Sequence, residues 1–338
     1  MKTLSCTTPG TLDYIGRKQP DLKKDHTILK IKRVGICGTD LHAFEGKQPF
    51  FEYPRVLGHE LAGEIVEMDN APGFELGETV TIIPYFSCGN CISCRNGKPN
   101  CCVRIKVCGV HTDGGMAEYL SVPSNSLVHS QGLSLDELAL VEPLAIGAHG
   151  ISRTNLKPGE FILVVGAGPI GLGAMEFAKI TGANVIALDV NESRLQFCKT
   201  TLGIDYTIDA KSADISGQLA NITNGDMPTV IIDATGSQAA INNSFQYMAH
   251  GARYLLIGLQ KGDISFSHPE FHKREGTLMS SRNALRSDFD HVIASMKNNL
   301  VKPSTYITHK VSFDKAKDSF KGFLAPENNV IKAMISFD

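Results

Sequence analysis

The stretch that decides the fold is FILVVGAGPIG, residues 161–171. An apolar segment, Phe161–Val165, runs into the spacing G-x-G-x-x-G, and a second apolar segment, Ile170–Ile180, follows. This order predicts a buried strand, a tight turn and a helix. Because the free backbone N–H groups at a helix N-terminus attract anions, the turn indicates a binding site for the pyrophosphate of a dinucleotide.

The glycines of this turn have separate predicted roles. Gly166 would permit the tight turn, and Gly168 would let the backbone approach the pyrophosphate. Gly171 would allow the helix to pack closely on the strand. Pro169 and Ile170 stand between the last two glycines and complete the predicted cofactor-binding turn.

Asp189, at the end of the next predicted strand, is the expected determinant of cofactor choice. Its carboxylate would accept hydrogen bonds from an adenosine ribose and repel a 2′-phosphate, which favours NAD over NADP. Arg194 could flank the adenine, although a solvated helix arginine is an equal alternative. Further candidates stand at the ends of later strands, where a plain strand end is the alternative: Thr235, Gly236 and Gly258.

Strand and helix patterns alternate from about residue 150 to residue 282. The predicted strands are Phe161–Val165, Asn184–Leu188, Val230–Asp233 and Arg253–Gly258. The predicted helices are Ile170–Ile180, Ser193–Leu202 and Gln238–Met248. Alternation of this kind predicts an α/β domain with a doubly wound parallel sheet.

The segments on either side of this region predict a second, β-rich domain. Before it, short apolar runs are separated by Gly, Pro and Asp turns: Thr27–Val34, Leu61–Glu67, Thr79–Pro84 and Glu118–Val122. After it come a predicted helix, Ser287–Asn299, and two predicted strands, Ile307–Phe313 and Val330–Ser336. We expect this tail to return to the first domain, so residues 1–149 and 283–338 form one domain and residues 150–282 the other.

A run of cysteines with the spacing C-x2-C-x2-C-x7-C predicts a metal site. The run comprises Cys88, Cys91, Cys94 and Cys102. Thiolates this close together, with glycines and a proline between them, can surround one ion tetrahedrally. This is the ligand set of a closed structural zinc site.

A second metal site is predicted from residues of mixed chemistry. Cys37, His59 and Glu60 supply a thiolate, an imidazole and a carboxylate, and Glu142 is a possible further ligand. Such ligation, with one position left open, is typical of catalytic zinc, although each residue taken alone has an ordinary structural explanation.

Two further residues near the mixed site are candidates for proton transfer. Thr39 lies two residues after Cys37, and its hydroxyl could accept a substrate proton and pass it through the cofactor ribose to His42. For His42, a plain surface histidine is the alternative.

Bulk composition excludes several classes of function. The chain has 338 residues, 42% hydrophobic and 20% charged, with a formal net charge of −2, which suits a two-domain globular enzyme. Lysine and arginine are scattered, so a zinc module that binds nucleic acid is not expected. No secretory signal or membrane span is expected, and cysteines at C-x2-C spacing favour metal and a reducing cytoplasm. The cysteines without a predicted ligand role are Cys6, Cys101, Cys108 and Cys198.

The chain resembles the medium-chain zinc-dependent dehydrogenases over nearly its full length. The stretches that match are VGICGTDLH, YPRVLGHELAGEIVE, the run from Cys88 to Cys102, DGGMAEYLSVP, VEPLAIGAH and VVGAGPIGLG. The resemblance implies a GroES-like catalytic domain and a Rossmann domain that binds NAD. It also implies two zinc ions per chain, held by the two ligand sets above, and a homodimer or homotetramer.

Within this family the chain is similar to the sorbitol and threonine dehydrogenase branch, because Glu142 stands where the ethanol-oxidising enzymes have cysteine. Three stretches resemble bacterial enzymes that oxidise the sugar acid L-galactonate at C5 to a keto acid: KQPFFEYPRVLGHE, NCCVRIKVCGVHTDGGMAEYLSVP and PEFHKREGTLMSSRNA. An anionic substrate needs donors near the metal, and His111, Arg282 and Asn283 are candidates, with structural roles as the alternative.

We therefore expect an NAD-dependent zinc dehydrogenase that acts on a secondary alcohol of a sugar acid. A neutral polyol such as sorbitol, or L-threonine, is the alternative substrate. A non-catalytic protein that binds zinc and a nucleotide is the alternative from another class.

Overall fold

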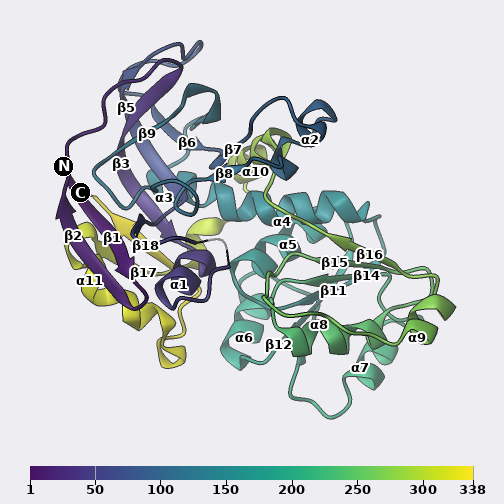
Figure 1. Ribbon diagram of the computed structural model, residues 1–338. Helices are drawn as coiled ribbons and strands as arrows, with labels where there is room; N and C mark the ends of the chain where they lie inside the picture. Colours follow the sequence, from purple (N-terminus) through teal and green to yellow (C-terminus); the bar gives the residue numbers. More distant parts are fainter. Residues whose placement is uncertain (50, 338) are drawn as a thin grey trace. The chain divides into compact units, whose positions relative to one another are not determined.

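The chain divides into two compact units in the computed structural model, which describes residues 1–49 and 51–337 (Figure 1). The first unit comprises Met1–Pro143 and Leu285–Asp338, and the second comprises Leu144–Ala284. The junction predicted after residue 149 falls inside a helix, α4, Val141–Thr154. The sequence did not predict this helix, and the first unit ends within its first turn.

The second unit contains a six-stranded parallel sheet, built from described residues in the order β13-β12-β11-β14-β15-β16. The strands are β11 Phe161–Val165, β12 Asn184–Asp189, β13 Tyr206–Asp209, β14 Val230–Asp233, β15 Arg253–Leu256 and β16 Thr277–Ser280. This is the strand order of a doubly wound dinucleotide-binding sheet, so the predicted fold class is confirmed. The outer strands β13 and β16 were missed because both are largely exposed and lack a continuous apolar run.

Helices flank this sheet, and in Figure 1 its strands lie between α4 and α8. Besides α4 they are α5 Pro169–Ile180, α6 Glu192–Thr200, α7 Ile215–Ile222, α8 Gln238–Ser244 and α9 His268–Lys273. The helix predicted for Gln238–Met248 was too long, since a 3-10 turn, Phe245–Tyr247, replaces its end. The Ser244 hydroxyl donates to the Ala240 carbonyl at 2.8 Å, a local bond that competes with regular helix. No helix of the described ranges is long and apolar enough to cross a membrane.

The first unit is built mainly from antiparallel strands around β3, His26–Ile36. The strands in its largest sheet, as far as the structure describes it, are β3, β5 Glu60–Met68, β6 Thr79–Ile82, β9 Tyr119–Pro123, β10 Leu127–His129, β17 Ile307–Ser312 and β18 Lys332–Ser336. A smaller sheet holds β1 Lys2–Thr8, β2 Thr11–Gly16 and β4 Arg55–Val56, and β7 Tyr85–Phe86 pairs with β8 Lys106–Val107. β18, near the end of the chain, pairs antiparallel with β3 of this unit.

Short helices join the strands of the first unit. They are α1 Gly38–Phe44, α2 Ile92–Arg95, α3 Leu135–Ala139, α10 Arg286–Lys297 and α11 Ala316–Ser319. The predicted helix Ser287–Asn299 therefore exists and is displaced by one or two residues at each end. Gly46 after α1, Gly97 after α2 and Asn299 after α10 have positive φ angles, which is the usual way for a helix to end.

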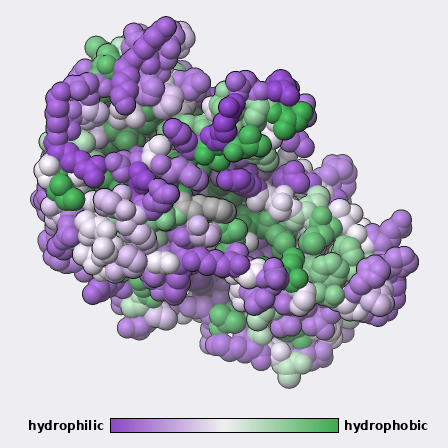
Figure 2. All heavy atoms as spheres, viewed as in Figure 1, coloured by the Kyte–Doolittle hydropathy of each residue, from purple (hydrophilic) through white to green (hydrophobic). Residues whose placement is uncertain are grey.

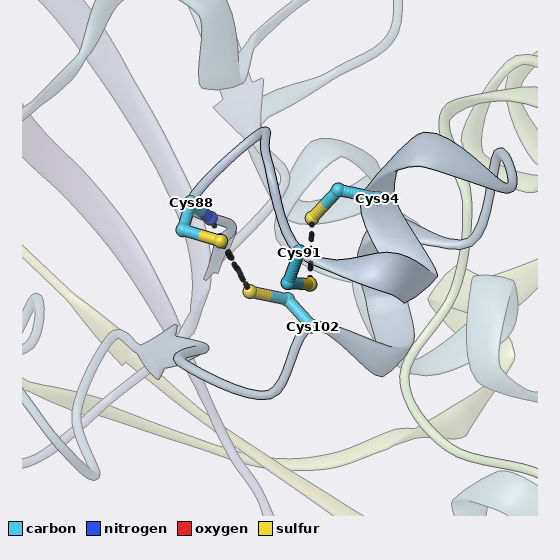
Figure 3. A group of neighbouring side chains, drawn as sticks. All are labelled: Cys88, Cys91, Cys94 and Cys102. Atoms are coloured by element: carbon cyan, nitrogen blue, oxygen red, sulfur yellow. Dashed lines mark hydrogen bonds between the residues drawn. The ribbon is translucent and has the colours of Figure 1, made fainter.

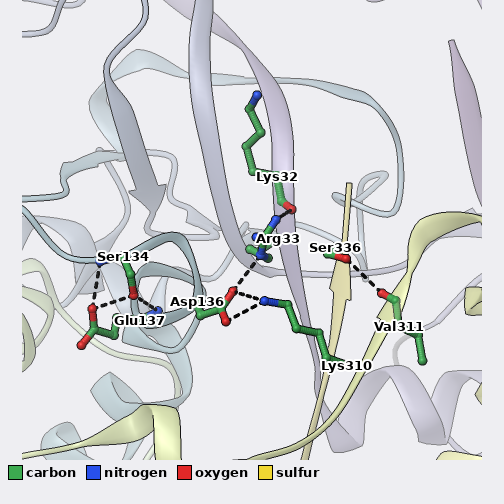
Figure 4. A network of polar contacts seen from close by, with 8 residues as sticks. All are labelled: Lys32, Arg33, Ser134, Asp136, Glu137, Lys310, Val311 and Ser336. Atoms are coloured by element: carbon green, nitrogen blue, oxygen red, sulfur yellow. Dashed lines mark hydrogen bonds and ion pairs between the residues drawn. The ribbon is translucent and has the colours of Figure 1, made fainter. Parts of the chain in front are cut away.

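A polar network joins three distant segments of the first unit (Figure 4). Asp136 at the start of α3 accepts a hydrogen bond from Arg33 Nε of β3 at 2.7 Å. Lys310 of β17 donates to both oxygens of Asp136, at 3.0 and 2.8 Å. Although burial opposes its ionisation, these two cations hold the pKa of Asp136 below its usual value.

We expect Asp136→Asn to destabilise the first unit by about 1–2 kcal/mol, because the nearly buried Arg33 then loses its anion. The loss corresponds to a fall of roughly 2–6 °C in Tm, measured by circular dichroism. Asp21→Asn is the matched control, since the ion pair of Asp21 with Lys18 is exposed and should contribute almost nothing. Equal Tm values for the two variants would contradict a structural role for the network.

Candidate functional site

The mixed ligand set comes together in the first unit. The ligand atoms of Cys37, His59 and Glu60 all lie within 4.8 Å of one another. Cys37 follows β3 and caps α1, while His59 and Glu60 stand where β5 begins. The antiparallel register pairs Gly35 of β3 with Glu60, and a Cβ at Gly35 would overlap the Glu60 carboxylate. Only glycine at this position leaves room for the cluster.

Asp40 lies next to the cluster, and the sequence did not indicate this residue. Its buried carboxylate accepts backbone N–H bonds from Cys37 at 2.9 Å and Gly58 at 3.0 Å. The same carboxylate lies 3.9 Å from His59 Nδ1. Burial lowers the pKa of His59, but the thiolate of Cys37 and the carboxylate of Asp40 outweigh it and raise that pKa well above its ordinary value. A carboxylate that accepts a hydrogen bond from the ring commonly orients a metal-binding imidazole, and Asp40 is near His59 but too far away for that bond.

Lys332 is a second residue that the sequence did not indicate. Its ammonium lies 2.6 Å from each carboxylate oxygen of Glu60 and 3.1 Å from the carbonyl of Ile36. The side chains of Lys332 and Glu60 are 2% and 0% exposed, so the pair is fully buried. A buried carboxylate without such a partner would be strongly disfavoured, and Lys332 therefore supplies the counter-charge for Glu60 beside the cluster.

Glu142 lies in the first turn of α4 and is bonded to Tyr85. The Tyr85 hydroxyl donates to Glu142 Oε1, and both residues are buried. Burial raises the pKa of Glu142 to about 7, and Glu60 adds to the rise although His59 opposes it. The tight group of three ligand atoms does not include Glu142.

The donor set fits a divalent zinc ion. A thiolate, an imidazole and carboxylates are the ligands of catalytic zinc. Cys37, Glu60, Glu142 and the adjacent Asp40 offer up to four anions and Lys332 one cation, so a doubly charged ion would offset most of the negative charge of this buried group. Charge balance of this kind favours burial, because an uncompensated charge is costly in the interior. The buried His59 Nδ1 has no hydrogen-bond partner among the described residues, and Asp40 is its nearby carboxylate.

The four cysteines of the second predicted metal site also converge (Figure 3). Their sulfur atoms all lie within 4.8 Å, with 3.4 Å between Cys88 and Cys102 and 3.4 Å between Cys91 and Cys94. A tetrahedral zinc site with bonds of about 2.3 Å has sulfur–sulfur separations of about 3.8 Å, so the cluster fits zinc with small adjustments.

Donors around these sulfur atoms strengthen that fit. The backbone N–H groups of Cys88 and Arg104 each point to Cys102 Sγ at 3.3 Å. The Arg104 guanidinium lies 3.4 Å from Cys88 Sγ, a contact that the sequence did not indicate. Cys102 is buried, whereas the adjacent Cys101 is exposed, and all nine cysteines are free thiols. The arrangement therefore favours Cys102 over Cys101 as the fourth ligand.

The segment that carries the four cysteines has little apolar interior of its own. Its helix α2 has no buried residue, and Ile92 and Val103 are 58% and 70% exposed. Figure 2 shows hydrophobic side chains on the surface around this segment. Metal–sulfur bonds are therefore the interactions that can hold this segment in one conformation.

The glycine-rich turn lies at the carboxyl edge of the sheet in the second unit. Gly166 has a φ of +99°, which favours glycine, and a Cβ at Gly171 would overlap the Gly166 carbonyl oxygen. A Cβ at Gly168, the N-cap of α5, would meet nothing within 4 Å. Pro169 and Ile170 begin the first turn of α5. Because no atom lies near the Cβ position of the N-cap Gly168, there is open space at the start of this helix.

Asp189 ends β12 and contacts the same turn. Its carboxylate accepts N–H bonds from Ala167 at 2.6 Å and Asn191 at 2.8 Å. Asn191 is the N-cap of α6, and its side chain accepts a hydrogen bond from the backbone N–H of Arg194. This bond fixes the position of the first turn of α6, which contains Arg194.

The neighbouring strand ends meet through Asp233, which was not among the predicted site residues. Its buried carboxylate accepts from the backbone N–H groups of Thr235 at 3.1 Å and Gly236 at 3.0 Å. A Cβ at Gly258 would overlap the Gly236 backbone and approach the Asp233 carboxylate. The loops after β14 and β15 can therefore come this close only because position 258 is a glycine. The predicted cofactor residues therefore share one edge of the sheet.

The remaining predicted site residues are the candidates for proton transfer and for substrate binding. Thr39 is half-buried and His42 exposed, both on α1. His111 belongs to the first unit, where its Nδ1 accepts from the Val107 backbone N–H at 3.1 Å. Arg282 is exposed in the second unit, and Asn283 beside it has a φ of +55°. The structure does not bring these substrate candidates together within one unit.

Comparison with known proteins gives a consistent result over the whole chain. A family model described as "Alcohol dehydrogenase GroES-like domain" matches residues 23–132. A second model, described as "Zinc-binding dehydrogenase", matches residues 169–298.

Individual relatives extend the similarity to full length. The chain is 42% identical to L-galactonate-5-dehydrogenase of Escherichia coli K12, covering 100% of this chain and 99% of that protein. It is 31% identical to a sorbitol dehydrogenase of Halalkalibacterium halodurans, covering 95% and 96% of the two chains. A crystal structure of the rspB alcohol dehydrogenase of Escherichia coli CFT073 with NADH matches at a TM-score of 0.92 and 31% identity, covering 100% and 99%. The chain therefore belongs to the zinc-type medium-chain alcohol dehydrogenase family and is an oxidoreductase.

Proposed function

We propose that this protein oxidises a secondary alcohol of a sugar acid, of the L-galactonate type, to a keto acid with NAD as the hydride acceptor. The reaction class rests on the buried group of Cys37, His59 and Glu60. The substrate class is supported by the 42% identity to L-galactonate-5-dehydrogenase over the whole chain. Two zinc ions per chain, a homodimer or homotetramer and a cytoplasmic location belong to the same proposal.

The mixed site suits alcohol oxidation. Zinc held by Cys37, His59 and a carboxylate would supply Lewis-acid polarisation of the alcohol, and NAD would accept the hydride. Thr39 and His42 lie three residues apart on α1, and side chains at this spacing are neighbours on a helix. Thr39 would accept the proton of the substrate hydroxyl as it releases its own toward His42, and the exposed His42 would give that proton to water.

The choice of NAD is proposed to depend on Asp189. Its carboxylate is held in place by the backbone N–H groups of Ala167 and Asn191. A fixed anion at the end of β12 binds ribose hydroxyls and repels a 2′-phosphate. The NADH complex of the rspB relative supports the same choice.

We expect Asp189→Ala to lower the ratio of kcat/KM for NAD over NADP by about 10–100-fold, because both the ribose acceptor and the repulsion are lost. Initial rates with the two cofactors measure this ratio. Asp226→Ala, which removes an exposed carboxylate of the same unit, should leave the ratio unchanged. An unchanged ratio in Asp189→Ala would remove this residue from the account of cofactor choice.

His111 is the best-defined donor among the substrate candidates. The Val107 backbone N–H can only donate, so Nδ1 of His111 accepts and the neutral ring carries its proton on Nε2. This tautomer gives the imidazole an N–H that can bind a hydroxyl or carboxylate of a sugar acid.

A substrate panel tests the proposal. Zinc-replete protein is mixed with NAD and aldonates, polyols or L-threonine, and NADH formation is followed by absorbance. Turnover of L-galactonate or a close aldonate would support the sugar-acid substrate. Turnover of polyols alone would favour the sorbitol-type activity of the Halalkalibacterium relative. NAD binding without any turnover would favour the non-catalytic alternative.

A further inference from the structure

Two carboxylates lie beside the proposed catalytic metal, and each has its own buried donor. Glu60 is bonded to Lys332 and Glu142 to Tyr85. The donors differ in the number of protons that they offer, since an ammonium carries three and a phenol one. This difference determines which carboxylate oxygen remains available to a metal ion.

Lys332 engages Glu60 completely. Its Nζ lies at the same distance, 2.6 Å, from both oxygens of Glu60, and a third bond to the Ile36 carbonyl fixes the ammonium. Moving a Glu60 oxygen toward a metal would weaken a buried ion pair. Each Glu60 oxygen keeps a lone pair, but the ion pair with Lys332 fixes its position, so Glu60 is less free than Glu142 to move toward a metal.

Tyr85 engages only one oxygen of Glu142. Its single proton is donated to Oε1, so this bond leaves Oε2 as a donor atom for a metal. The Tyr85 ring is held by the pairing of β7 with β8 and by an edge contact with Phe289, whose ring centroid is 6.4 Å away. Phe289 is fully buried on α10, so the hydroxyl cannot turn away without repacking this region.

We propose that Tyr85 is a positioning residue for the catalytic metal, and that its bond to Oε1 of Glu142 presents Oε2 as the carboxylate ligand. The inference rests on the proposed metal site but needs no particular substrate. Outer partners of metal ligands commonly change metal affinity by about 10–100-fold when they are removed.

Tyr85→Phe tests the role, because it keeps the ring and removes only the proton donor. Metal-free protein is reloaded with Co²⁺, whose visible absorption reports the ligand set. The spectrum of Cys37→Ser, which lacks a ligand of the catalytic site, is subtracted to remove the contribution of the four-cysteine site. We expect a changed catalytic-site spectrum and a Co²⁺ affinity about 10–100-fold weaker.

The matched control is Tyr254→Phe. Tyr254 is a fully buried tyrosine of the second unit, and its hydroxyl donates to the Ile241 carbonyl at 3.1 Å. This variant loses a buried hydroxyl of the same kind and should keep the wild-type Co²⁺ spectrum and affinity. Wild-type metal binding in folded Tyr85→Phe would overturn the proposal.

A double-mutant cycle with Glu142→Gln tests whether Tyr85 acts through Glu142. The combined variant should bind Co²⁺ no more weakly than Glu142→Gln alone, whereas additive losses would refute the mechanism. If Tyr85→Phe does not fold, Phe289→Leu provides a second test, because it removes the edge contact that holds the Tyr85 ring and leaves Glu142 unchanged. We expect a weaker Co²⁺ affinity, and a wild-type affinity would count against the proposal. Since the readout is metal binding, failure of the substrate panel and failure of this inference are distinguishable.

Discussion

Cys37→Ser is expected to lower kcat/KM by about three orders of magnitude or more while NAD still binds. The thiolate is the soft ligand of the mixed set, and a serine hydroxyl is a poor ligand for zinc at neutral pH. The fold should survive, because Cys37 occupies the N-cap of α1 and serine is a preferred N-cap residue. The glycine-rich turn belongs to the other unit and is unchanged.

Three measurements on the same preparation test this expectation. NADH absorbance gives the rate, calorimetry gives the NAD affinity, and atomic absorption gives the zinc content. Cys101→Ser is the control, because it makes the same chemical change at an exposed thiol. A Cys37→Ser protein with normal turnover would refute the catalytic metal site, and one that had lost NAD binding would indicate a wider structural defect.

The sequence predicted central parallel strands best. β11 and β14 have the predicted bounds, Phe161–Val165 and Val230–Asp233, because a strand buried on both faces is a continuous apolar run. The edge strands β13 and β16 carry no such run, since much of their surface is exposed. Their positions are determined by pairing with β12 and β15, which is information that local patterning does not contain.

In the candidate sites, too, motifs that are local in the sequence were predicted, whereas contacts between distant residues were not. The cysteine run and the glycine-rich turn are local, so their spacing indicated both. Lys332 and Glu60 are separated by 272 residues, and only the pairing of β18 and β5 with β3 brings them together. Nothing near Lys332 distinguishes it from the other lysines of the chain. Tyr85 could not be predicted for the same reason, since its partner Glu142 lies 57 residues away.

The second large effect is expected at the four-cysteine site, where Cys101 and Cys102 provide a matched pair. We expect Cys102→Ser to lose one zinc per chain and about 4 kcal/mol or more of stability, roughly 10 °C or more in Tm. The segment depends on its metal, because α2 buries no side chain that could replace the lost bonds.

Cys101→Ser should keep the wild-type zinc content and Tm, because the Cys101 thiol is exposed while Cys102 Sγ lies among the other three sulfur atoms. Zinc analysis, thermal unfolding and limited proteolysis within residues 88–102 compare the two variants. The two substitutions are chemically identical and adjacent in sequence, so a difference in zinc content between them reports which sulfur reaches the metal, whereas the difference in Tm also includes the burial of Cys102. A reversed result would assign the fourth ligand to Cys101, and it would mean that the N–H bonds from Cys88 and Arg104 to Cys102 Sγ serve the fold rather than the ion.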